Sequence, residues 1–328
     1  MKKNIAVVFG GYSSEAVISE RSSLTILKYL PPEKYNAFKV RIEREEWNVV
    51  SDNQNREPID KTDFSFVCNG RKTKFDCAYM IIHGAPGENG LLQSYFDMVG
   101  VPYTTCNPFV SALAFNKYAC KCYLRDSGIN MPDEILIGPE DSISSGEIVE
   151  KLGLPVFVKP NAGGSSFGIT KVKHIDNLPK AIDKARKEDH EIIIESYVKG
   201  REFSHGIVIT EDRIIKLPVT EIITSNEFFD YEAKYADGIS EEITPANISD
   251  ELSEKIRSST EKISKRLNCR GIIRIDYICA DNDKLFFLEI NTVPGMSEQS
   301  IVPKQLREAG YSVSEIIDLQ IQDSLKRA

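Results

Sequence analysis

The chain has 328 residues, 41% of them hydrophobic and 27% charged, and its formal net charge is −8. This composition excludes intrinsic disorder and fibrous structure for the chain as a whole, and the length indicates roughly two domains. No run of about 18 apolar residues occurs, so we expect no membrane-spanning helix and no membrane partner. The acidic balance lacks the basic footprint of nucleic-acid binding, so we expect no nucleic-acid partner.

The seven cysteines form no Cys-x-x-Cys pair, and their number is odd. This pattern fits reduced thiols and a cytoplasmic location. Only four histidines occur, and no two of them have the spacing of metal ligands. We therefore expect no zinc site.

The first part of the chain alternates strand-like and helix-like segments. We predict helices at residues 15–30 and 90–99, and strands at 4–9, 37–42, 64–68, 77–82 and 101–105. This alternation favours a parallel sheet in a Rossmann-like domain over residues 1–105. The first strand ends in Gly10 and Gly11, but the Gly-x-Gly-x-x-Gly fingerprint is absent, which argues against a nicotinamide-dependent oxidoreductase.

The rest of the chain is expected to form two α+β domains, over residues 106–195 and 196–328. In the first we predict helices at 108–127, 144–152 and 178–187, and strands at 134–137, 155–159, 169–172 and 191–197. In the second we predict strands within 202–223, a helix at 250–267, strands at 272–279 and 285–290, and terminal helices. The stretch 225–248 is polar and irregular, and a long segment of this kind in a compact domain is usually functional.

The last two predicted strands form a hairpin that carries polar residues on one face. A two-residue turn at 282–283 places Asp276 opposite Glu289 and Arg274 opposite Asn291. Side chains two apart on a strand share a face, so these four project together. Opposed carboxylates repel unless a cation lies between them, and Mg²⁺ takes a few carboxylates plus substrate phosphates.

The opposite face of this hairpin is predicted to be apolar and buried. It carries Ile273, Ile275, Tyr277, Phe286, Leu288 and Ile290. A hairpin with one buried face and one polar face is better explained by a functional site on the polar face than by simple exposure to solvent.

A glycine-rich loop at 160–168 follows the strand that carries Lys159. Its backbone N–H groups could hold an anion. It is not a Walker A loop, because Ile169 stands where a lysine is required. Lys117 and Lys234 lie in neighbouring segments, and phosphates attract lysines as point charges.

Together these residues resemble the D-alanine–D-alanine ligase family of the ATP-grasp superfamily. The resemblance covers nearly the whole chain, and its blocks occur in the family's order, at 10–15, 83–90, 101–104, 116–117, 158–168, 194–195, 200–203, 230–235, 274–276 and 288–296. The blocks at 231–235 (Tyr-Glu-Ala-Lys-Tyr) and 289–296 (Glu-x-Asn-Thr-x-Pro-Gly-Met) are highly specific. There are two departures, because Asn89 and Ala16 stand where the family often has aspartate and arginine or histidine.

The resemblance implies an α/β chain with the ATP-grasp fold, in which the two α+β domains sandwich ATP. It implies ligation of two D-alanine molecules through a D-alanyl phosphate, with release of ADP and phosphate, for peptidoglycan synthesis. It further implies two Mg²⁺ ions, or Mn²⁺ in their place, and a homodimer formed through the N-terminal domain.

The resemblance also implies a role for each site residue. Lys117 and Lys159 would contact the α- and β-phosphates of ATP, Lys234 the γ-phosphate, Glu202 the ribose, and Glu195, Ser196, Tyr197 and Val198 the adenine. Asp276, Glu289 and Asn291 would hold the metal ions. Glu15 and His83 would bind the first D-alanine, Ser300 and Ile301 the second, and Arg274 and the N–H of Gly295 the oxyanion. Ser165 and Tyr235 would join two loops into a lid over the site.

Two other readings stay open at this stage. One is another ATP-grasp carboxylate–amine ligase, including D-alanine–D-lactate ligases, which generally lack a tyrosine at the position of Tyr235. The other is a nucleotide-binding regulatory protein without turnover, but Arg274, Asp276, Glu289 and Asn291 are all present.

Overall fold

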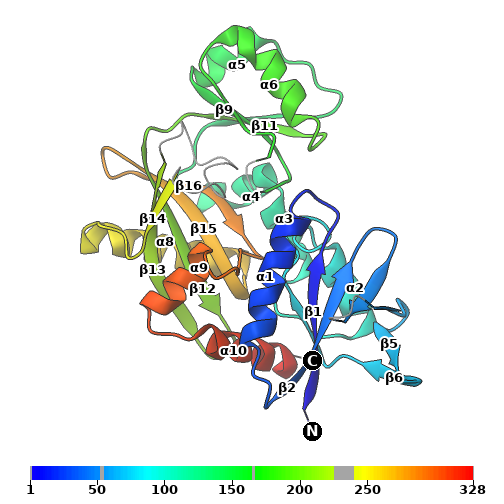
Figure 1. The fold of residues 1–328 in the computed structure, drawn as a ribbon. Coiled ribbons are helices and arrows are strands. Elements are labelled where there is room, and N and C mark those ends of the chain that lie inside the picture. The colour runs from blue at the N-terminus through cyan, green and yellow to red at the C-terminus, as the bar shows by residue number, and fades with distance from the viewer. Residues whose placement is uncertain (1, 52–54, 165–166, 225–239, 328) are drawn as a thin grey trace.

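The computed structural model describes residues 2–51, 55–164, 167–224 and 240–327 (Figure 1). Three large sheets organise these residues, and a two-stranded sheet accompanies the first. Figure 1 shows the second sheet at one end of the molecule, with the first and third sheets side by side at the other. None of the described helices is long and apolar enough to cross a membrane.

The first sheet has the strand order β4-β3-β2-β1-β7. Its elements, with the helices that follow them, are β1 (Lys3–Gly10), α1 (Ala16–Tyr29), β2 (Tyr35–Ile42), β3 (Trp47–Val50), β4 (Arg56–Pro58), β7 (Cys77–Met80) and α2 (Leu91–Val99). Strands β2 and β7 both pair parallel to β1, which confirms the predicted parallel sheet. The antiparallel strands β3 and β4 were not predicted, because they are short and β4 is fully exposed.

Two further predictions for this region need correction. The strand at 64–68 leaves the first sheet and pairs as β5 (Ser65–Cys68) with β6 (Arg71–Lys74). The strand expected at 101–105 is wrong, since only Tyr103 forms a bridge, to Ala78 of β7. Pro102 has no N–H to donate, so the segment cannot continue a regular ladder.

The second sheet is antiparallel, with the order β10-β9-β11-β8. Its strands are β8 (Glu134–Ile137), β9 (Val156–Pro160), β10 (Thr170–Val172) and β11 (Ile192–Ser196), and helices α5 (Ser145–Leu152) and α6 (Leu178–Ala185) cover it. An aliphatic core between these helices and the sheet holds the unit together. The side of the sheet away from the helices is thereby left for the site described below.

The single helix expected at 108–127 is wrong. It divides into α3 (Pro108–Phe115) and α4 (Lys117–Leu124), and a 3₁₀ turn follows α4. Between them Asn116 is extended, with φ −87° and ψ 102°, and its side chain accepts a hydrogen bond from the N–H of Ala119 at 2.8 Å. Asparagine at this position starts a new helix because its side chain satisfies a free backbone N–H. The break places Lys117 in the first turn of α4.

The third sheet has the order β14-β13-β12-β15-β16 and is antiparallel. Its elements, with the helices around it, are β12 (Gly200–Ile209), β13 (Ile214–Thr224), β14 (Ser240–Ile243), α8 (Asp250–Leu267), β15 (Gly271–Ala280), β16 (Leu285–Asn291), α9 (Ile301–Glu308) and α10 (Val313–Lys326). Part of the stretch expected to be irregular is therefore strand β14, and its residues 225–239 lie outside the described residues.

The first and third sheets share one hydrophobic core. Residues of β1, β7 and α1 pack in it with residues of β12, β13, α9 and α10. The chain's last two helices thus fix the first sheet against the third. The expected domain divisions after residues 105 and 195 stay predictions.

We predict that Gly271→Ala destabilises the protein more than Gly70→Ala. Both glycines have a positive φ, +77° and +73°, where alanine costs roughly 1–2 kcal/mol. A Cβ on Gly271 would also lie 2.3 Å from the carbonyl oxygen of Thr104, whereas a Cβ on Gly70 would meet nothing within 4 Å. Overpacking adds about 1–3 kcal/mol at residue 271 alone. Thermal unfolding of both variants measures this difference, and equal losses would contradict the close packing of β15 on residue 104.

Candidate functional site

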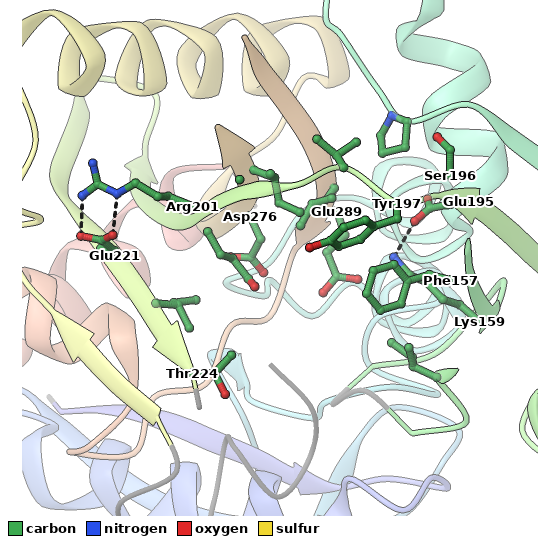
Figure 2. Close-up of a pocket in the computed structure, with 18 of the residues that line it drawn as sticks. Phe157, Lys159, Glu195, Ser196, Tyr197, Arg201, Glu221, Thr224, Asp276 and Glu289 are labelled. Atoms are coloured by element: carbon green, nitrogen blue, oxygen red, sulfur yellow. Dashed lines mark hydrogen bonds and ion pairs between the residues drawn. The ribbon is translucent and has the colours of Figure 1, made fainter. Parts of the chain in front are cut away.

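A cavity of about 460 Å³ lies between the second and third sheets (Figure 2). Its walls come from β9 and β11 on one side and from β12, β13, β15 and β16 on the other. The structure brings many of the expected site residues to its lining, namely Lys159, Glu195, Ser196, Tyr197, Val198, Glu202, Arg274, Asp276 and Glu289. Positions more than a hundred residues apart in the sequence therefore meet at one site.

Strands β15 and β16 form the hairpin expected from the sequence. Asp276 pairs with Glu289 and Arg274 pairs with Asn291, which confirms the predicted pairing at the site. Figure 2 shows the side chains of Asp276 and Glu289 close together in the middle of the cavity.

The rest of the hairpin contains two departures that cancel each other. The turn spans three residues, 281–283, instead of two, and Asp283 adopts a left-handed φ of 57°. A two-residue turn favours glycine after asparagine, and aspartate tolerates the left-handed region that the longer turn needs. Further along, Tyr277 pairs with Phe287, and a bulge then leaves Leu288 unpaired before the ladder resumes. The extra residue restores the register that the longer turn had shifted.

The bulge changes which residues of β16 face the core. Leu285 and Phe287 pack in the core, whereas Leu288 lines the cavity. Phe286 pairs with Ile278, which also lines the cavity. Placing Phe286 and Leu288 on the buried face was therefore wrong, because the bulge interrupts the alternation of the strand. The other residues expected to be dry are buried, namely Ile273, Ile275, Tyr277 and Ile290.

Asp276 is buried in a set of hydrogen bonds. Its carboxylate accepts from the hydroxyl of Ser204 at 2.6 Å, from the amide of Asn291 at 3.2 Å and from Nε and Nη2 of Arg274 at 2.9 and 2.7 Å. Two parallel N–H···O bonds fix the orientation of the guanidinium and also hold its positive charge against the carboxylate. Arg274 therefore offsets one of the two facing carboxylates.

The other carboxylate, that of Glu289, lies 3.5 Å from Nζ of Lys117. Lys117 also donates to the carbonyl of Gly163 at 2.6 Å, so α4 and the glycine loop converge on Glu289. Within the part of the chain that the structure describes, no three His, Cys, Asp or Glu side chains form a group that could hold a metal ion. The oxygen atoms available to a cation here are those of the Asp276 and Glu289 carboxylates and of the Asn291 amide. Such a set suits a hard cation that completes its coordination shell with phosphate oxygens.

A second charged group lies at the opposite wall of the cavity. Nζ of Lys121 and Nζ of Lys159 both donate to the carboxylate of Glu195, the latter at 2.5 Å. Burial alone would raise the pKa of Glu195, but the two lysines lower it to about 2. Sequence reasoning gave Lys121 no role, because a lysine one turn after Lys117 looks like an ordinary surface residue.

Glu15 lies buried at the N-terminal end of α1, between two glycine-containing loops. A Cβ on Gly164 would lie 2.7 Å from one carboxylate oxygen of Glu15, and a Cβ on Gly84 would lie 3.0 Å from the other. Glycine at these positions therefore permits both loops to approach the carboxylate. The glycine loop thus lies against the N-terminal end of α1 as well as against α4.

The ring of His83 is held between α1 and the segment that follows β16. Nδ1 donates to the carbonyl of Val293 at 2.8 Å, because a carbonyl can only accept. Burial lowers the pKa of His83, so the ring is neutral and Nε2 accepts from the hydroxyl of Ser22 at 3.2 Å. That hydroxyl in turn accepts from the N–H of Met296 at 3.2 Å. This chain of bonds fixes the backbone on both sides of Gly295.

The residues expected at the second substrate lie on the same segment. Ser300 directly precedes α9, whose first residue is Ile301. A Cβ on Gly295 would lie 3.0 Å from the hydroxyl oxygen of Ser300, so these two positions are neighbours. Ser165, Lys234 and Tyr235 lie outside the described residues.

Glu88 was missed as a site residue although it stands in one of the family blocks. It is buried and accepts from the N–H of Gly84 at 2.7 Å and from the N–H of Val293 at 3.3 Å. Burial, with a contribution from the charge of Glu15, raises its pKa to about 8. Glu88 thereby links the segment after β7 with the segment after β16. The sequence alone does not show that these two segments meet.

We predict that Glu88→Gln flattens the pH dependence of stability between pH 5 and pH 8. Because the native pKa is raised above the unfolded value, Glu88 binds more protons in the native state across this window. Its contribution to stability therefore falls as the pH rises, by at most about 1.4 kcal/mol per pH unit. In urea unfolding, the free energy of unfolding of wild type relative to the variant should therefore be higher at pH 5 than at pH 8. Glu57→Gln, at an exposed glutamate, is the control, and parallel curves for all three proteins would refute the assignment.

Comparison with known proteins gives a consistent result. Family models described as the D-ala D-ala ligase N-terminus and C-terminus match residues 4–106 and 123–322. The D-alanine–D-alanine ligase of Parabacteroides distasonis is 47% identical, over 99% of this chain and 98% of that relative.

Solved structures agree with the sequence comparison. The VanG D-Ala:D-Ser ligase of Enterococcus faecalis has a TM-score of 0.88 and 30% identity, covering 98% of this chain and 99% of that one. A D-alanine–D-alanine ligase of Bacillus anthracis, solved in complex with ATP, has a TM-score of 0.79 and 29% identity, covering 100% and 98%. The fold is thus the ATP-grasp fold expected from the sequence, and the chain belongs to the D-alanine–D-alanine ligase family.

Proposed function

We propose that this protein joins two D-alanine molecules to D-alanyl-D-alanine with ATP, through a D-alanyl phosphate, releasing ADP and phosphate for peptidoglycan precursor synthesis. The family membership supports the reaction. The observation that carries the proposal is the hairpin of β15 and β16, which turns Asp276 and Glu289 toward a cavity whose other wall carries Lys159.

ATP occupies this cavity in our proposal, and the Bacillus anthracis relative was solved in complex with ATP. Phe157 and Tyr197 on one wall and Leu288 on the other give the apolar surfaces that a nucleobase needs, with the hinge residues 195–198 at its edge. Glu202 lines the same cavity and would hold the ribose.

The phosphates would extend toward the lysines of the site. Lys159 lines the cavity, and Lys117 lies beside Glu289 at its edge, where both can meet the α- and β-phosphates. Lys234 would reach the γ-phosphate. Lysine ammonium groups suit phosphates because they act as compact point charges.

Two Mg²⁺ ions, or Mn²⁺ in their place, would be held by Asp276, Glu289 and Asn291. When bound, such ions neutralise charge on the transferred phosphoryl group. The oxygen donor set fits this role, and the buried Asp276 is already surrounded by hydrogen-bond donors that orient it. Arg274, which is paired with Asp276, would add its own positive charge near the reacting acyl group.

The amino-acid site would lie beside Glu15 and His83. The carboxylate of Glu15 binds the ammonium of the first D-alanine, whose own carboxylate attacks the γ-phosphate. The neutral His83 adds no competing charge. The ordered backbone around Gly295 supports an N–H that, with Arg274, stabilises the oxyanion formed when the second amine attacks.

Ser300 and Ile301 would flank the second D-alanine, and Ser165 and Tyr235 would close the site. Closure matters because water would hydrolyse the acyl phosphate. We also place the reaction in the cytoplasm, where ATP is made, which agrees with seven free cysteines. A homodimer through the N-terminal domain completes the proposal.

A second candidate concerns the acceptor only. The VanG structure belongs to a D-Ala:D-Ser ligase, so D-serine is a chemically reasonable second substrate. The 47% identity to a D-alanine–D-alanine ligase, against 30% to the D-Ala:D-Ser ligase, favours D-alanine.

We predict that Glu289→Gln lowers the ligation rate by at least about 100-fold, because removing one key electrostatic group commonly costs that much. The melting temperature should change little, since relief of the repulsion from Asp276 offsets the loss of the ion pair with Lys117. Phosphate release and thermal unfolding measure the two effects, and Glu150→Gln at an exposed glutamate is the control. Near-normal turnover by folded Glu289→Gln protein would remove the metal assignment.

A further prediction concerns the identity of the product. With D-alanine, D-serine and D-lactate in equal supply at pH 7–8, D-alanyl-D-alanine should be the main product and the D-lactate ester should be nearly absent. Tyr235 is neutral near pH 7 at its reference pKa of about 10, so the site offers no extra cation to attract an anionic acceptor. Product analysis by mass spectrometry measures this. Mainly depsipeptide or D-alanyl-D-serine at pH 7.5 would overturn the acceptor assignment.

A further inference from the structure

Lys121, Glu195 and Lys159 form a charged cluster at the wall of the nucleotide cavity. Glu195 and Lys159 line the cavity, whereas Lys121, on α4, is completely buried behind them. Glu195 is 2% exposed and accepts from both lysines, each through a different oxygen of its carboxylate. Figure 2 shows the Lys159–Glu195 pair beside Phe157 and Tyr197.

The buried ammonium of Lys121 needs an explanation. Lysine is almost never fully buried unless it is paired, because taking its charge out of water is costly. Glu195 and Lys159 already make a complete ion pair, so a second lysine is not required to satisfy either of them. Buried ion pairs are also weak evidence of a gain in stability, since desolvation can exceed the attraction.

The charge sum of the cluster indicates a role in binding. Without Lys121, the carboxylate of Glu195 would neutralise Lys159, and the wall would present no net charge to a phosphate. With Lys121 the cluster carries a net charge of one positive unit, and Lys159 is its only member that is both cationic and on the cavity wall. Each oxygen of the Glu195 carboxylate accepts from one lysine of the cluster, so the side chain of Glu195 orients Lys159.

We propose that Lys121 is a positioning residue that offsets Glu195, so that Glu195 can orient Lys159 without cancelling its charge toward the nucleotide phosphates. This inference rests on the proposed nucleotide site and adds to it a residue that contacts no substrate. Lys121 therefore affects affinity for phosphates and leaves affinity for the nucleoside unchanged. A merely structural role would weaken both.

The experiment compares the binding of Mg-ADP and of adenosine by calorimetry. In Lys121→Met we expect the dissociation constant for Mg-ADP to rise at least about tenfold, as for loss of a charged hydrogen bond, and that for adenosine to stay within about twofold. Lys121→Met/Glu195→Gln restores one positive unit and should return the Mg-ADP affinity to within about threefold of wild type. Lys159→Met shows how far the Mg-ADP affinity falls when the lysine on the cavity wall is removed. Lys151→Met, at an exposed lysine, is the matched control.

Three results would overturn the inference: unchanged Mg-ADP binding by Lys121→Met, an equal loss for Mg-ADP and adenosine, or no recovery in the double variant. If Lys121→Met does not fold, the double variant carries the test, because it removes the buried carboxylate together with the second lysine. Wild-type Mg-ADP affinity in it then supports the inference, and a tenfold loss overturns it. Failure of wild type to bind Mg-ADP or to ligate D-alanine would instead refute the proposed function.

Discussion

Two carboxylates face each other across β15 and β16, and the site depends on how their repulsion is offset. Asp276 is compensated within its own strand by Arg274, and Glu289 by Lys117 from α4. The hairpin alone therefore could not hold this arrangement at low energy. It requires α4 to bring Lys117 within reach of Glu289 on β16, and Lys117 stands in the first turn of α4 because the chain breaks at Asn116.

The two walls of the cavity carry opposite charge patterns. The wall from the third sheet carries more carboxylates than arginines, and the wall from the second sheet carries Lys159 with the net positive cluster behind it. A ligand that fits both must be anionic toward one wall and bring cations toward the other. A polyphosphate with divalent ions has this character, whereas a simple anion or a free metal ion would satisfy only one wall. The charge pattern thus favours a metal–nucleotide complex independently of the family.

The sequence predicted the hairpin strands and the facing pairs, because alternating apolar and polar residues define both faces of a strand. It reached the right pairing through two errors that cancel, the turn at 281–283 and the bulge at Leu288. Neither the broken helix nor Lys121 could be predicted in this way. The break depends on the side chain of Asn116 capping a new helix, and the role of Lys121 depends on a carboxylate 74 positions away in the chain.

The two halves of the site are built by different kinds of interaction. On the proposed amino-acid side, a shared hydrophobic core joins the first and third sheets, and buried hydrogen bonds with His83, Glu88 and Ser22 hold the backbone from Val293 to Met296. Such bonds are short-ranged and directional, so they fix the place of a backbone N–H closely. On the nucleotide side, long lysine side chains reach carboxylates on other elements. Charge attraction acts over a longer distance than a hydrogen bond does, so these contacts persist when the walls move slightly. The groups that we propose for the oxyanion and the amino acid, where small errors in position would reduce the rate most, therefore lie on the half of the site that packing fixes best.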